Sequence, residues 1–497
     1  MIHKLITAAL LLSLSASAAN WYVRPDGGAY GAENGSNWAN AYDGFSDVSW
    51  GSINAGDTLY VGAGTYTQEL TIPDDGSSGS PIIIRASQDT HTGTVNFNAG
   101  ISFISRSYIK LDGEYNGAPQ FVVNGGVEGA YSNHPDLRYV IAHSAEAGFN
   151  FPGNVNGVDG VGGTFYKCIT TNIQGFAAIN FTARSHTARA FDQVRVESCT
   201  LWVNSLAGSV NGSGGIAGSG SGPDGIQGCW GMTVTNTVFT NQTGTITLQG
   251  ADYEHQDYIQ MMRGYIKVQG CKFYGSADSA IGFDTWNGSP IYHVIENCEF
   301  YLYRGSGIRY YGPSFNATSL IFRGNGFYNH TSEHQWAFSY IPDGGVNPSF
   351  SGSFQNNVFY NCLGDGAEGK AVQINGSTAA TAANWNFDYN YLGGSSATVD
   401  GTGDYSQTHN ITGTPQFVNA AGWDFRLAAN DSALKDAGLD LSAGYTSDIN
   451  GVSRPQGSAF DVGPHEYQSG GGEPEPPATT NRMFRFNTVR ASTVIAR

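Results

Sequence analysis

Four short segments between residues 224 and 311 repeat one pattern: Asp224-Gly225-Ile226-Gln227, Asp257-Tyr258-Ile259-Gln260, Ser279-Ala280-Ile281-Gly282 and Ser306-Gly307-Ile308-Arg309. A second series alternates with them: Val234–Phe239 (VTNTVF), Val268–Phe273 (VQGCKF) and Ile295–Phe300 (IENCEF). Two alternating motifs indicate a repeat of at least two strands and a turn. One such repeat cannot bury its apolar side alone, whereas stacked repeats form a continuous core. The stretch therefore predicts the coils of a parallel β-helix.

A column of equivalent positions extends this repeat in both directions. Its members, aligned on the cysteine of the second series, are Cys168, Cys199, Thr237, Cys271, Cys298, Asn325, Asn357 and Asn390. The spacing is unequal, with 38 residues from Cys199 to Thr237 and 27 from Cys271 to Cys298. Unequal steps are typical of a solenoid whose strands keep their length while its loops vary. Helical periodicity is absent, which excludes ankyrin and tetratricopeptide arrays.

The cysteines in this column are expected to be buried free thiols. Neighbouring coils are about 4.8 Å apart, close enough for a disulfide. However, side chains in register on parallel strands point the same way, which disfavours the disulfide torsion. The thiols should therefore pack as small apolar groups. The Cys and His spacings do not indicate a zinc site.

Composition also indicates a turn-rich all-β protein. Of 497 residues, 68 are glycine, while aromatic and charged residues each make up 13%. The formal net charge of −17 argues against nucleic acid or an anionic membrane surface as partner. An acidic chain can bind an anionic polymer only where local Arg, Lys or calcium overcomes the repulsion.

Four segments are predicted along the chain. Residues 1–18 have the charged start, short apolar run and Ala16-Ser17-Ala18 site of a signal peptide. Residues 19–467 form the β-helix with terminal caps, 468–478 a Gly/Pro linker and 479–497 a basic tail. We expect a secreted or surface-attached monomer without a membrane span, because the apolar run at residues 5–14 is too short to cross a bilayer.

Both ends of the β-helix carry motifs of a known superfamily. They are Trp21–Gly27, Ala55–Tyr66 and Gly79–Ala86 at the start, and Asp436–Gly438 and Phe460–Tyr467 at the end. Over about residues 20–467 the chain resembles the pectate-lyase-like superfamily, including the chondroitinase B and alginate lyase family. The resemblance implies an all-β, single-stranded right-handed parallel β-helix with an N-terminal cap and a C-terminal closing segment. It also implies a lyase acting on an acidic polysaccharide. The Asn-Lys-Ser and Arg-His-Gly signatures of that family are absent, so no catalytic residue is carried over.

The candidate site lies on the four repeated segments between residues 224 and 311. Alternation points the isoleucines inward and a row of amides and an arginine outward, with carboxylates at the strand starts. Such groups bind sugar hydroxyls and carboxylates, and aromatic rings can stack on sugars. The predicted catalytic residues are Asp224, His255, Asp257, Arg263 and Arg309. The predicted substrate-binding residues are Asn180, Gln227, Gln260, Asp284, Trp286, Arg304, Tyr310 and Tyr311. Gln373 is expected to lie too far along the β-helix to matter.

Three functions remain open from the residues. A lyase needs a base, such as His255, and a cation that neutralises a uronate carboxyl. That cation is either an arginine or calcium held by Asp224, Glu254 and Asp257. A hydrolase would use Asp224 and Asp257 as a pair of carboxylates. A non-catalytic carbohydrate-binding surface protein would need no ionisable cluster on one face, and the density of charged residues around position 257 argues against it.

Overall fold

The computed structural model divides the chain into two compact units, each described here by itself. Unit 1 comprises Met1–Ala188 and Asp192–Cys229, and unit 2 comprises Arg189–Phe191 and Trp230–Arg497. The structure describes residues 17–143, 147–152, 162–173, 177–181, 194–203, 224–227, 231–241, 257–261, 265–274, 279–284, 290–301, 306–312, 316–329, 336–342, 351–362, 370–375, 384–393, 398–402, 405–442 and 444–469. The predicted signal peptide up to residue 16, the linker from residue 470 and the basic tail lie outside these ranges.

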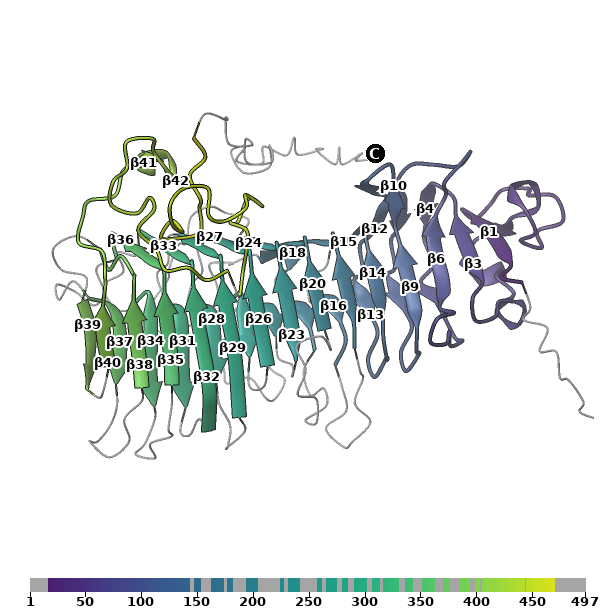
Figure 1. The fold of residues 1–497 in the computed structure, drawn as a ribbon. Coiled ribbons are helices and arrows are strands. Elements are labelled where there is room, and N and C mark those ends of the chain that lie inside the picture. The colour runs from purple at the N-terminus through teal and green to yellow at the C-terminus, as the bar shows by residue number, and fades with distance from the viewer. Residues whose placement is uncertain are drawn as a thin grey trace, which may run out of the picture. The chain divides into compact units, whose positions relative to one another are not determined.

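Unit 1 is built from three parallel sheets that the chain visits in turn, coil after coil (Figure 1). Sheet A contains β2 (Tyr42–Asp43), β1 (Asn20–Arg24), β3 (Thr58–Val61), β6 (Ile82–Ala86), β9 (Ile109–Asp112), β14 (Asp136–Arg138), β17 (Thr164–Tyr166) and β20 (Val194–Glu197). Sheet B contains β4 (Gly64–Tyr66), β7 (Val95–Phe97), β12 (Phe121–Val123), β15 (Val140–His143), β18 (Ile169–Ile173) and β21 (Thr200–Val203). Sheet C contains β5 (Leu70–Thr71), β8 (Ile101–Ser102), β13 (Val127–Glu128), β16 (Ala147–Asn150), β19 (Ala177–Asn180) and β22 (Asp224–Gln227).

Unit 2 repeats the same three-sheet plan. Its sheet A contains β23 (Met232–Thr235), β26 (Tyr265–Gln269), β29 (Pro290–Glu296), β32 (Asn316–Arg323), β35 (Ser351–Gln355), β38 (Asn384–Asp388) and β40 (Tyr405–Thr408). Sheet B contains β24 (Val238–Asn241), β27 (Lys272–Tyr274), β30 (Glu299–Tyr301), β33 (Gly326–Tyr328) and β36 (Val358–Tyr360). Sheet C contains β25 (Ile259–Met261), β28 (Ser279–Asp284), β31 (Ser306–Gly312), β34 (Phe338–Pro342), β37 (Lys370–Asn375) and β39 (Thr398–Thr402). The predicted parallel β-helix is thereby confirmed in each unit.

Short elements complete the two ends of the described chain. Near the N-terminus are the 3-10 turns η1 (Trp38–Asn40), η2 (Phe45–Asp47) and η3 (Trp50–Ser52), and the hairpin β10 (Glu114–Tyr115) with β11 (Ala118–Pro119) follows within unit 1. Unit 2 ends with β41 (Phe417–Asn419), η4 (Ala420–Gly422) and β42 (Asp424–Leu427). None of the helices in the described ranges is long and apolar enough to cross a bilayer.

The predicted column lies inside the coils, at the turn between sheets A and B. Within unit 2, the side-chain oxygens of Asn325, Asn357 and Asn390 accept backbone N–H groups of the preceding coil at 2.9–3.0 Å. Their amide nitrogens donate at 2.8–3.0 Å to carbonyls of strands in sheet A. All three are fully buried. Each buried amide therefore has partners on both sides, as a polar group in a core requires.

The cysteines of the column also contact a backbone carbonyl of the preceding coil, with the thiol in place of the amide. Cys168 and Cys199 in unit 1 point their thiols at the carbonyls of Leu137 and Phe165, both at 3.4 Å. In unit 2, Cys298 reaches the Val268 carbonyl at 3.7 Å. Five described cysteines, Cys168, Cys199, Cys271, Cys298 and Cys362, are free and buried. The prediction of unpaired thiols is confirmed for the four cysteines of the column, and Cys362, which lies outside the column, is free as well.

The C-terminal segment from residue 415 to 467 covers sheet B of unit 2. Phe425 stacks on Tyr328 with ring centroids 3.9 Å apart, and both are almost fully buried. Further along, Nε2 of His465 lies 2.7 Å from Oε1 of Glu299, whose other oxygen is 2.8 Å from Nζ of Lys272. The outer face of sheet B is thus occupied by the chain itself, so a long ligand must bind elsewhere.

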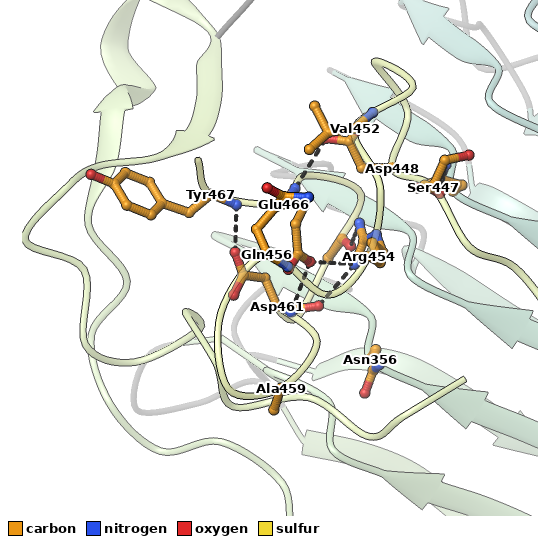
Figure 2. A network of polar contacts seen from close by, with 12 residues as sticks. Asn356, Ser447, Asp448, Val452, Arg454, Gln456, Ala459, Asp461, Glu466 and Tyr467 are labelled. Atoms are coloured by element: carbon orange, nitrogen blue, oxygen red, sulfur yellow. Dashed lines mark hydrogen bonds and ion pairs between the residues drawn. The ribbon is translucent and has the colours of Figure 1, made fainter. Parts of the chain in front are cut away.

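A buried polar network holds this segment together (Figure 2). Arg454 donates to the carbonyls of Asp461 and Gly463 at 3.0 and 2.8 Å. The Asp461 carboxylate accepts the backbone N–H of Tyr467, and Glu466 accepts that of Asp461. Burial, together with the charge of Glu466, raises the pKa of Asp461 to about 7. The motif at residues 460–467 therefore closes the end of unit 2 through hydrogen bonds rather than apolar packing alone.

The thiols should resist modification in the folded protein. We expect the five described cysteines to remain unlabelled by iodoacetamide under native conditions, because each is at most 2% exposed. In denaturant without a reductant all five should be alkylated, as mass spectrometry of the peptides would show. A cross-linked pair among them would contradict the prediction.

Glu299→Gln should destabilise unit 2 strongly. Burial alone would raise the pKa of Glu299, but the charge of Lys272 and contact with His465 hold it well below its usual value. Without that carboxylate Lys272, whose side chain is only 17% exposed, loses its counter-ion. Breaking a buried charge pair in this way typically costs about 3–5 kcal/mol. Urea denaturation would measure the loss. Glu197→Gln, at an exposed carboxylate, is the matched control, and equal midpoints for the two variants would contradict the expectation.

Asp461 should make stability depend on pH. A carboxyl whose pKa rises from 3.8 to about 7 on folding binds its proton more tightly in the folded state. Its stabilising contribution is therefore complete below pH 4 and is lost as pH rises to 7. We expect the fall in melting temperature from pH 5 to pH 8 to be smaller in Asp461→Asn than in the parent. Only this change in melting temperature with pH is compared between the two proteins, because the amide of the variant also loses one hydrogen-bond acceptor at every pH. An equal fall in the variant and the parent would contradict the role of Asp461.

Candidate functional site

The outer face of sheet C in unit 2 carries the predicted row of polar positions. The register pairs Gln260 with Gly282, Gly282 with Arg309, Arg309 with Ser339, and Ser339 with Gln373. The preceding residues of β25, β28 and β31 are isoleucines with no exposed surface, so the row faces outward. Side chains from adjacent strands of the row are about 4.8 Å apart. Of these positions Gln260 and Arg309 are partly exposed, so a ligand on this face would meet them first.

Asp257 lies beside this row, two residues before β25 begins at Ile259. A Cβ atom placed on Gly282 would lie 2.4 Å from Oδ2 of Asp257 and 2.8 Å from its Cγ. The carboxylate therefore fills the space that a side chain at position 282 would need. It lies on the outer face one strand from Arg309, yet only 2% of the residue is exposed. This brings a buried carboxylate and a guanidinium of opposite charge to neighbouring strands.

Hydroxyl and amide groups continue the face beyond the arginine. The Oγ atoms of Ser306 and Ser339 are 3.0 Å apart, and both residues are fully buried. Gln373 follows on β37 and is 7% exposed. It was expected to lie far from the site, but the register puts it in the same row, two strands from Arg309. The sequence could have shown that Gln373 belongs to this row, because Val372 before it occupies the inward position of the isoleucines.

Tyr310 does not belong to the outer face, contrary to the sequence-based expectation. It is fully buried, stacked against Phe283 with ring centroids 4.5 Å apart. Its hydroxyl lies 2.9 Å from Nδ1 of His293, which is also buried. A ring inside the coil cannot stack on a sugar. Strict alternation from Ile308 already places residue 310 on the inner side.

Many predicted site residues fall outside what the structure describes. His255, Glu254, Arg263, Trp286 and Arg304 lie outside the described residues. The backbones of Asp224, Gln227, Asp284 and Tyr311 belong to strands, but their side chains are not described. Asp224 also belongs to unit 1 and Asp257 to unit 2. The proposed carboxylate pair and the calcium ligands therefore stay predictions.

A second polar row lies on sheet C of unit 1, and the sequence analysis found only one of its members. Asn180 donates from Nδ2 to Oδ1 of Asn150 at 2.6 Å, and Asn150 donates likewise to Oε2 of Glu128 at 2.6 Å. Burial raises the pKa of Glu128, although the hydrogen bond from Asn150 opposes the shift. The signal was present, because Val127-Glu128 and Phe149-Asn150 repeat the apolar–polar pair of the predicted row. A half-buried carboxyl hydrogen-bonded to an amide row is a second candidate for contact with a ligand on sheet C of unit 1.

Metal-binding geometry is not found among the described side chains. They contain no group of three or more His, Cys, Asp and Glu residues that could hold an ion. Of the three acids expected to bind calcium, only Asp257 has a described side chain. Its neighbour Arg309 would repel a cation at the same place.

Gly282→Ala should push the Asp257 carboxylate aside. Glycine is needed there for space, since a Cβ would lie 2.4 Å from Oδ2. We expect a loss of thermal stability of about 1–3 kcal/mol, as for other overpacked sites. In an Asp257→Ala background the same change should cost little, because the clash is removed.

Gly51→Ala is the matched control, since nothing lies within 4 Å of the Cβ it would add. The double-mutant cycle is read from melting curves and requires no activity. Additive effects of the two substitutions at the site would show that the carboxylate does not lie over Gly282.

Comparisons with known proteins concern the fold. No protein-family model matches the chain, and no curated protein sequence is detectably similar. Among solved structures, the pectate lyase Pel9A aligns with 91% of this chain and 97% of its own at 14% identity and a TM-score of 0.39. The PL6 family alginate lyase AlyGC aligns with 92% of this chain and 60% of its own at 11% identity and a TM-score of 0.46. A rhamnogalacturonan lyase aligns with 69% of this chain and 82% of its own at 14% identity and a TM-score of 0.37. The strand registers make this chain a parallel β-helix.

Proposed function

We propose that the chain is a secreted polysaccharide lyase that cleaves an acidic glycan on the outer face of sheet C in unit 2. One observation carries the proposal: the Asp257 carboxylate lies over side-chain-free Gly282, one strand from the outward Arg309. The predicted signal peptide supports export. The lyases that align with the chain supply no residue for this site.

Arg309 is the group we assign to the substrate carboxyl. β-Elimination removes a proton from the carbon beside a uronate carboxyl, so negative charge grows on that carboxyl. A guanidinium binds a carboxylate through two parallel N–H donors and stabilises this charge. The position on β31 suits the role, because an outward side chain there meets a chain lying across the strands.

Asp257 is assigned to positioning and proton transfer around the reacting sugar. The sequence places His255 two residues earlier, and this histidine stays the predicted base. In the step, the base takes the proton, the freed electron pair forms a carbon–carbon double bond, and the bond to the glycosidic oxygen breaks. The leaving oxygen then takes up a proton. A buried carboxylate beside the base would raise the basicity of its imidazole.

Activity should be tested by following two products at once. Purified protein is incubated with polygalacturonate, alginate and neutral dextran while ultraviolet absorbance and reducing ends are recorded. A lyase releases both signals from an acidic glycan. We expect Asp257→Asn and Arg309→Gln each to lower turnover by about a hundredfold or more, because each removes a charge that acts in the transition state.

Thr235→Ala is the control, since this outward residue belongs to β23 of sheet A and not to the proposed site. Reducing ends without absorbance would identify a glycoside hydrolase instead, and the absence of both signals would favour a binding protein. An EDTA arm tests the predicted calcium: activity lost on chelation and restored by calcium supports it. Full activity in both site variants would move the chemistry elsewhere, with Glu128 the next carboxyl to test.

A further inference from the structure

Sheet A of unit 1 gathers the positive charge of its unit. In a chain of formal net charge −17, every described Lys and Arg of unit 1 lies on a strand of sheet A or in a turn next to it. These residues are Arg24, Arg85, Arg106, Lys110, Arg138, Lys167 and Arg195. The described strands of sheets B and C in the same unit carry none. Such segregation needs a physical reason, because stacking of the coils does not depend on outward charge.

The outer face of this sheet is open to solvent and ordered strand by strand. The register aligns Tyr60, Arg85, Asp112, Arg138 and Tyr166 in one outward row. The side chain of Arg85 is 36% exposed and that of Arg138 is 41% exposed. Because one strand separates them, the two arginines are roughly 10 Å apart along the β-helix. An extended polymer with regularly spaced charges could meet both at once.

Among Arg85, Lys110 and Arg138, three cations share two carboxylates. Asp112 lies 3.7 Å from Arg85 and 3.2 Å from Lys110, so one carboxylate serves two cations. Asp136 accepts from Nε of Arg138 at 2.9 Å, and the side chain of Arg138 is still 41% exposed. Nζ of Lys167 lies 5.3 Å from the ring centre of Tyr166, and Cζ of Arg138 lies 5.9 Å from the same ring centre. A fork of N–H donors next to a tyrosine ring suits a sugar that carries a carboxylate.

We propose that the outer face of sheet A in unit 1, from β6 to β20, is a second binding surface for an acidic polysaccharide. Its ligand is a polyuronate segment whose carboxylates bind Arg85, Arg138 and Arg195. The surface holds the polymer without cleaving it. This goes beyond the proposed function, because it uses another sheet and needs no catalysis at Asp257.

Affinity gel electrophoresis tests the surface. The protein carries Asp257→Asn so that polygalacturonate in the gel stays intact, and neutral dextran replaces it in a parallel gel. We expect retardation by polygalacturonate alone, largely lost in 0.5 M NaCl. The double variant Arg138→Gln/Arg195→Gln should bind about tenfold more weakly, because two charge-assisted contacts are removed. Glu197→Gln, which removes an exposed carboxylate from the same face, should bind more tightly.

The control double variant Arg426→Gln/Lys435→Gln removes equal charge from the C-terminal segment of unit 2 and should bind as the parent does. Equal weakening in both double variants, retardation by dextran, or no gain in Glu197→Gln would each overturn the proposal. Binding is scored separately from turnover. If the sheet C variants stay active while the sheet A variants lose affinity, only the proposed function fails. If the sheet C variants lose activity while the sheet A variants keep their affinity, only this inference fails.

Discussion

The buried amide column between sheets A and B is the interaction on which the rest of the described structure depends. Asn325, Asn357 and Asn390 each accept a backbone N–H of the preceding coil and donate their own N–H to a backbone carbonyl of that same coil. An amide with any partner missing would leave a buried polar group unsatisfied, at a cost of about 1–3 kcal/mol. The column therefore fixes which coil pairs with which. Once that register is set, every outward row on the three sheets follows from it.

Much of this architecture could be predicted, because it rests on repeated local patterns. The column from Cys168 to Asn390 was visible as equivalent positions in the sequence, and the inward isoleucines at 259, 281 and 308 are buried as expected. A thiol and an amide occupy the same column because both can donate to the carbonyl behind them. Fold and inner faces are thus encoded by residue type at equivalent positions of successive coils.

The outer site was less predictable, since the strand starts do not alternate strictly. Tyr258 and Ile259 both point inward, and a side chain on Gly307, before Ile308, would meet the ring of Phe327. Because Tyr258 and Ile259 both point into the coil, Asp257 lies on the outer face. Simple alternation from Ile259 would have placed Asp257 on the inner face. Glu128 was overlooked because the repeat was defined from residue 224 onward. Which groups meet across a face depends on side-chain reach, such as that of Asp257 over Gly282, and spacing alone does not encode it.

The C-terminal segment limits where function can reside. It covers sheet B of unit 2 with aromatic packing on Tyr328 and with the contact between His465 and Glu299. A buried ion pair of this kind adds little net stability over apolar packing, but it penalises every misplaced arrangement of the same segment.

Because each coil contacts only its neighbours, the outer rows have a consequence for how such a protein can change over evolutionary time. Duplication or loss of one whole coil would preserve the register on either side and lengthen or shorten a row by one position. A strand with glycine at the outward position, as in β28, makes room for a neighbour's acid without disturbing the interior. Recognition of a longer or shorter polymer can therefore arise by adding or deleting coils, while the geometry of the existing ones stays as inherited.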